Sequence, residues 1–148
     1  MIDKVGIFAM GTWGTGPFEN DTAADFAGDL DELAPEDRGG HIRAALLRVV
    51  EEPEYVEAPD ADEALAAAAL VAAGLPGGDP VHPVYGPEEP VPTLPADCQA
   101  LAVRAIDRIL APESELADLW VDAGDADEWR VVLARMRAVL GEGAPVPR

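Results

Sequence analysis

Residues 64–73 form an apolar run that no charged or polar side chain interrupts, and most of them are alanine. Alanine has the highest helix propensity, and its small side chain lets neighbouring helices approach closely. The run is about half as long as the roughly 20 residues of a membrane span. Pro59 and the acids that follow it suit a helix N-terminus, and Gly74 suits its end. We therefore expect a buried, central helix here.

Helical spacing recurs on both sides of this segment. Asn20, Asp21 and Thr22 are suitable N-caps for a helix that reaches about Leu33, and Asp25 can complete a capping box with Thr22. In this helix Phe26 and Leu30 should face inward. The next helix, which ends before Pro53, has one apolar stripe made of Ile42, Ala45, Leu46, Val49 and Val50. Three more helices are expected over about residues 96–110, 114–124 and 125–140, with Ser114 as the cap of the second and Trp129, Val132, Leu133, Met136 and Leu140 as the stripe of the third.

The segments between these helices complete the predicted organisation. Gly11, Gly14 and Gly16 predict an irregular loop, and the prolines of residues 75–95 predict a long crossover. Residues 1–9 are expected to be an N-terminal arm or an upstream start extension, and residues 141–148 a frayed tail. We predict a single compact all-α domain over residues 10–140, with five or six helices, a Gly-rich N-terminal loop and a Pro-rich connection in the middle.

The charge of the chain bears on its partners. Asp and Glu number 29 against 10 Lys and Arg, for a formal net charge of -19. Such a charge repels nucleic acids and anionic membranes and suits a basic protein. Base composition of a GC-rich genome is an alternative source of the same bias. One cysteine and no visible secretory signal predict a cytoplasmic protein.

The Gly-rich segment is similar to a nucleotide-binding loop but lacks the glycine spacing of such a loop. Its glycines follow the order G-x-x-G-x-G, whereas a dinucleotide-binding turn has G-x-G-x-x-G. Trp13 is too bulky for close approach of a pyrophosphate, and no second strand with a terminal acid follows. The segment instead predicts a turn in which Trp13 and Phe18 fill the helical core. No cofactor is expected.

Acidic side chains supply the one candidate metal site. Asp21, Asp25 and Asp29 recur every four residues, so they share a helix face, and Glu19 lies next to them in sequence. Carboxylates on one face can bind a divalent cation, or they can form a solvated surface near a helix N-terminus. His41 and His82 lack partners for a zinc site, and His41 is expected at the surface or as a cap. Cys98 is expected to be a buried, inert thiol, so no catalytic residue is predicted.

The opening segment carries a family resemblance. Met10 is followed by Gly-Thr-Trp-Gly-Thr-Gly-Pro-Phe-Glu-Asn-Asp, and Ala24-Asp25-Phe26 comes next. This resembles the opening of a bacterial family, domain of unknown function 4259, and weaker similarity extends to about Leu140. Phe26 stands where Trp is common in such sequences. The resemblance implies the fold but no activity. The residues that it marks as structural are Gly11, Trp13, Gly14, Gly16, Phe18, Asn20, Asp21, Trp120 and Trp129.

Three functional hypotheses remain open at this point. The leading hypothesis is that the chain is not an enzyme but a small acidic protein-interaction module, immunity-like, that binds a basic protein. The second is a metal-dependent or other enzyme that uses Glu19, Asp21, Asp25 and Asp29. The third is a purely structural helical domain. The sequence leaves the oligomeric state open.

Overall fold

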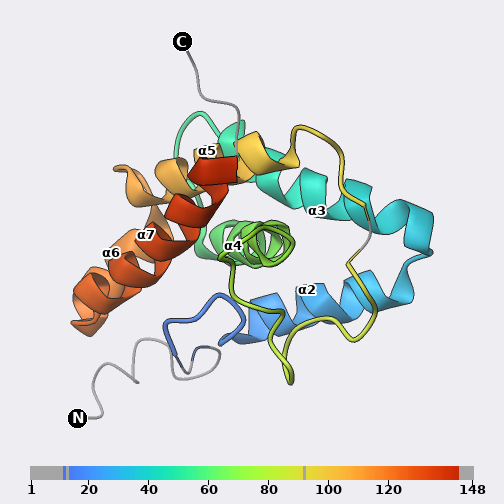
Figure 1. The fold of residues 1–148 in the computed structure, drawn as a ribbon. Helices are drawn as coiled ribbons and strands as arrows, with labels where there is room; N and C mark the ends of the chain where they lie inside the picture. Colours follow the sequence, from blue (N-terminus) through green and yellow to red (C-terminus); the bar gives the residue numbers. More distant parts are fainter. Residues whose placement is uncertain (1–11, 13, 92, 144–148) are drawn as a thin grey trace.

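The computed structural model describes residues 12, 14–91 and 93–143, and these residues contain six helices (Figure 1). The helices are α2 (Asp21–Glu32), α3 (Pro35–Val50), α4 (Ala58–Ala73), α5 (Cys98–Leu110), α6 (Glu115–Ala123) and α7 (Ala126–Gly143). The predicted all-α domain is confirmed. In this part of the chain, no helix combines the length and the apolar character needed to cross a membrane.

Helix α4 lies at the centre of the domain, as the alanine-rich run predicts. Figure 1 views it nearly along its axis, with α2, α3, α5 and α7 placed around it. It contacts each of the other five helices. Its alanines from Ala64 to Ala68, together with Leu65 and Leu70, are buried. Because alanine side chains are short, five helices can approach this one closely.

The surrounding helices bury the apolar stripes expected from their sequences. Phe26 and Leu30 of α2 and Ile42 and Leu46 of α3 are all less than 4% exposed. On α7 the buried side chains are Trp129, Leu133, Met136 and Leu140. Val50, Leu110 and Val132 are only half-buried and pack at the edges of this core.

Helix caps differ in part from the expectation. Asn20 is the N-cap of α2, and its side-chain oxygen accepts a hydrogen bond from the Ala23 N–H at 2.8 Å. The predicted capping box from Thr22 is wrong, because Asp21 is already the first helical residue. At α6, Ser114 occupies the N-cap but makes no capping hydrogen bond, and its buried hydroxyl has no hydrogen-bond partner among the described residues. The Ser114 backbone instead forms a bridge with Val56, which joins α6 to the start of α4.

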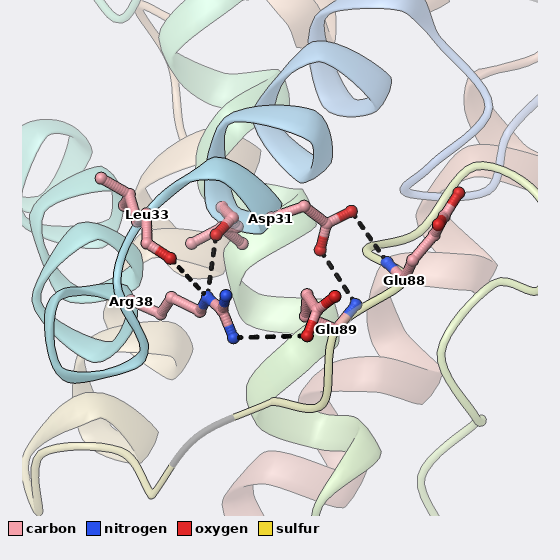
Figure 2. Close-up of polar contacts among 6 residues, drawn as sticks. Asp31, Leu33, Arg38, Glu88 and Glu89 are labelled. Atoms are coloured by element: carbon pink, nitrogen blue, oxygen red, sulfur yellow. Dashed lines mark hydrogen bonds and ion pairs between the residues drawn. The ribbon is translucent and has the colours of Figure 1, made fainter.

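The connection between α4 and α5 contains no helix or strand among its described residues, 74–91 and 93–97. Figure 2 shows how α2 and α3 hold its middle. Asp31 accepts hydrogen bonds from the backbone N–H groups of Glu88 and Glu89, at 2.9 and 3.0 Å. Arg38 donates to the carbonyls of Leu30 and Leu33 at the end of α2, and its guanidinium lies 4.0 Å from the Glu89 carboxylate. The connection is thus fixed across the α2–α3 corner.

Candidate functional site

The opening segment forms a closed loop in front of α2. Thr12 pairs with Asn20 in an antiparallel bridge, so the two ends of the loop lie side by side. Within it, the Gly16 N–H donates to a carboxylate oxygen of Glu19 at 2.9 Å, and the Glu19 N–H donates to the Gly16 carbonyl at 3.0 Å. A Cβ atom at Gly14 or Gly16 would collide with the Glu19 carboxylate. The glycines therefore leave room for the side chain that ties the loop together.

The other residues singled out in the sequence belong mostly to the core. Phe18 is 3% exposed. Trp120 and Trp129 are buried and stack with their ring centroids 6.2 Å apart, which joins α6 to α7. Asp21 is exposed at the first turn of α2. Gly11 and Trp13 lie outside the described residues, as do the arm 1–9 and most of the expected tail.

Asp62 lies beneath the opening loop in an unusual environment. It lines a small pocket together with Thr12, Thr15, Asn20 and the two stacked tryptophans. Its carboxyl group makes no hydrogen bond or ion pair within the described part of the chain. Burial raises its pKa from 3.8 to about 7, and the negative charges of Glu115 and Glu63 add to the effect. The carboxyl group is therefore about half protonated near neutral pH.

An apolar cleft lies on the other side of the same loop. It has a volume of about 350 Å³, and four segments line it: the loop at 16–19, the C-terminal half of α4, the connection at 77–83, and α7. Gly16 and Pro17 line both the cleft and the Asp62 pocket. The opening segment thus separates a small polar pocket from a larger apolar cleft.

The rim of the cleft carries the polar groups. Arg135 of α7 lies 3.6 Å from the Asp79 carboxylate of the connection, and both side chains are well exposed. His82 accepts hydrogen bonds through Nδ1 from the N–H groups of Val84 and Tyr85, at 3.2 and 3.1 Å. This leaves Nε2 as the hydrogen-bond donor of the neutral ring. An apolar floor with a few polar groups at the rim is the usual composition of a binding site.

The proposed metal ligands do not converge. Asp21, Asp25 and Asp29 are exposed along the outer face of α2, whereas the Glu19 carboxylate is turned back toward Gly16. Among the described residues, no group of three His, Cys, Asp or Glu side chains is placed to hold a metal ion. Asp21, Asp25 and Asp29 therefore form an exposed row of carboxylates, whereas Glu19 hydrogen-bonds within the opening loop. This geometry adds no support for a metal centre.

The histidines and the cysteine are also placed apart. His41 lies inside α3 rather than at its start, so it is not a cap; it is partly exposed, and its ring stacks on Phe26 at a centroid distance of 5.1 Å. Cys98 is buried at the start of α5, and burial, with a smaller contribution from the Asp97 carboxylate, raises the pKa of its thiol. A raised pKa opposes formation of the reactive thiolate.

Charge is distributed unevenly over the surface. Arg43, Arg48, Arg135 and Arg137 each pair with a carboxylate of another segment. Arg104 and Arg130 are exposed, and within the described residues they have no partner. The arginines of the described residues are thus only partly paired with carboxylates. In the part of the chain that the structure describes, no arginine pairs with the row Asp21, Asp25 and Asp29.

Sequence reasoning missed both Asp62 and the cleft. Asp62 reads as one of several acids at a helix N-terminus, where carboxylates are common. A signal was nevertheless present, because Asp62, Leu65 and Ala69 recur at i, i+3 and i+7 and so share the face that points toward the core. The cleft has no comparable signal, since its walls come from four segments that are distant in sequence.

Comparison with known proteins identifies a family for this chain. A family model, Domain of unknown function (DUF4259), matches residues 11–131, which include the opening loop, the Asp62 pocket and most of the cleft. No curated protein and no solved structure matches the chain. Because the family model covers most of the sequence, the chain belongs to the DUF4259 family.

Proposed function

We propose that this chain is a small acidic protein-interaction module, of the immunity-protein kind, which binds a basic protein through the outer face of α2. The observation that supports it is the row of Asp21, Asp25 and Asp29, exposed on one face and free of ion pairs within the described residues. Successive members are about 6 Å apart along the helix axis. Such a row is complementary to lysine and arginine side chains on a partner.

The distribution of arginine strengthens the proposal. Arg38 of α3 donates to the carbonyls of Leu30 and Leu33 at the C-terminal end of α2 and approaches Glu89, so it does not pair with the carboxylate row. The net charge of -19 adds a long-range attraction for a cationic protein. Electrostatic complementarity of this kind raises association rates and selects partners by charge. The rest of α2 is anchored by Phe26 and Leu30, so the row is held on a rigid element.

The proposal is tested by affinity capture from the native host at low and moderate salt, with mass spectrometry as the readout. Three forms of the chain are compared: wild type, an α2 variant with Asp21, Asp25 and Asp29 changed to Asn, and a control with Asp118, Asp122 and Asp127 changed to Asn. All six acids are exposed, and both triple variants remove the same charge. The α2 set removes one carboxylate from a first helical turn and the control set removes two, so a general loss of helix stability would be at least as large in the control.

The expected result is a near-stoichiometric basic partner that binds wild type and the control but not the α2 variant, and that is lost as salt is raised. Equal loss in both triple variants would show that total charge acts rather than the α2 face. No basic partner under any condition, or capture unaffected by either variant, would contradict the proposal.

A further inference from the structure

The apolar cleft beside the opening loop has the features of an anchor pocket. Its floor is made by small and apolar side chains, among them Ala69 and Ala72 of α4, Phe18 of the loop, and Met136 and Val139 of α7. The two alanines create the hollow, because a larger residue at either position would fill it. A volume of about 350 Å³ lies near the lower end of the roughly 300–1,000 Å³ typical of ligand sites. It suits one bulky apolar group better than an extended chain.

The charged residues around the cleft indicate which chemical groups can lie next to the bound apolar group. Glu19 and Asp79 supply carboxylates to the lining, and Asp21 begins the acidic row two residues after Glu19. Arg135 is the one base among the described lining residues besides His82, and it is engaged by Asp79. The charges of Asp79 and Arg135 offset each other, so Glu19 and the neighbouring Asp21 leave the surroundings negative, which favours an apolar group flanked by positive charge.

The position of the cleft indicates a protein rather than a small amine. The row from Asp21 to Asp29 extends about 12 Å along α2, at a rise of about 1.5 Å per residue. A molecule small enough to fill only the cleft does not reach along that row. A polypeptide segment can place one large side chain in the cleft and its basic neighbours opposite the carboxylates.

We infer that the cleft receives a large apolar side chain, aromatic or aliphatic, of the basic partner, with lysine or arginine on either side of it in that partner's sequence. This inference rests on the proposed function and names its specificity determinant. Interfaces commonly depend on one such buried side chain in a pocket, with charged groups around the rim.

The test uses three synthetic peptides and the full chain, labelled with ¹⁵N, in NMR titrations at low salt. The peptides are Lys-Lys-Trp-Lys-Lys, Lys-Lys-Gly-Lys-Lys and Ser-Ser-Trp-Ser-Ser. We expect the first to bind at least about tenfold more tightly than either of the others, since one buried aromatic side chain commonly contributes more than 1 kcal/mol. Its binding should shift the backbone amide signals of Ala72, Gly78 and Val139.

Two variants locate the binding. Val139→Trp places a large side chain at the cleft, whereas Val131→Trp adds the same side chain to an exposed position of the same helix. We expect Val139→Trp to reduce the affinity of the tryptophan peptide about tenfold, to that of the glycine peptide, and Val131→Trp to leave it unchanged. The peptide series on wild type decides the inference even if Val139→Trp fails to fold.

The outcomes separate this inference from the proposed function. Equal binding of the two lysine peptides, with shifts confined to α2, would overturn the anchor pocket and leave the acidic face intact. Equal binding of the two tryptophan peptides would overturn the basic flanks. If no peptide shifts any signal of the cleft, the inference is wrong.

Discussion

Replacing Asp62 by Asn should stabilise the protein at neutral and alkaline pH. The pKa of this carboxyl group rises from 3.8 to about 7 in the folded state, chiefly because burial disfavours the charged form. Each pKa unit corresponds to about 1.4 kcal/mol, so a fully ionised Asp62 costs the folded state about 4 kcal/mol. Since part of the side chain remains accessible to water, we expect a measured gain of about 2–4 kcal/mol at pH 8.

The sign of the pH dependence follows from linkage. Between pH 4 and pH 7 the folded protein keeps the Asp62 proton while the unfolded chain has lost it. Wild-type stability from this group therefore falls as pH rises through that range, and the loss is complete above the folded-state pKa. Asn cannot ionise, so the stability difference between variant and wild type should be small near pH 4 and should grow to its full value above pH 7.

Urea unfolding followed by circular dichroism from pH 4 to pH 8.5 measures this difference. Asp60→Asn is the matched control, since Asp60 lies in the same first turns of α4 and lines no pocket with the tryptophans. For Asp60→Asn, the stability difference from wild type should not grow with pH in this way. A destabilised Asp62→Asn at pH 8 would show that the carboxylate is favourably partnered in the folded state, and a difference independent of pH would show that folding does not shift its pKa. Either result would refute the reasoning.

Three further changes test other parts of the structure. Asn20→Ala removes the N-cap of α2 and should lower the free energy of unfolding in urea by about 1 kcal/mol. Asn20→Ser should retain most of the stability that the cap contributes. Asp31→Ala removes two hydrogen bonds to the connection, so limited proteolysis should cut residues 75–97 faster than in the control Glu32→Ala, with a loss of about 1–2 kcal/mol. Cys98 should react with a disulfide reagent at pH 8 far more slowly in the folded than in the urea-unfolded protein, and equal rates would contradict its burial and raised pKa.

Helix positions were predictable because the signals that set them are local. Prolines and glycines mark the ends of α3, α4 and α6, and the apolar stripe of α7 has the helical period. Capping was less predictable. Ser114 stands where a cap residue is expected, but its hydroxyl is buried without a partner, because the Val56 bridge and the packing of α6 decide its surroundings.

The candidate site was only partly predictable. The glycines of the opening loop pointed to a special turn, but the reason for them, the Glu19 carboxylate, depends on how the loop closes. The acids of α2 were visible as one helix face, whereas the absence of ion pairs to the row Asp21, Asp25 and Asp29 among the described residues depends on where the arginines of that part lie. Arg43 pairs with Asp97 and Arg137 with Asp107, partners that no local pattern indicates.

The amino-acid sequence by itself determined the helices, the central place of α4 and the acidic character of the surface. Periodicity, propensity and net charge are properties of short segments or of the whole composition, and they need no knowledge of contacts. The tertiary structure alone decided the cleft, the clamp of Asp31 on the connection and the raised pKa of Asp62. Each of these arises from groups far apart in the chain, whose distance and solvent exclusion are fixed only when the helices pack.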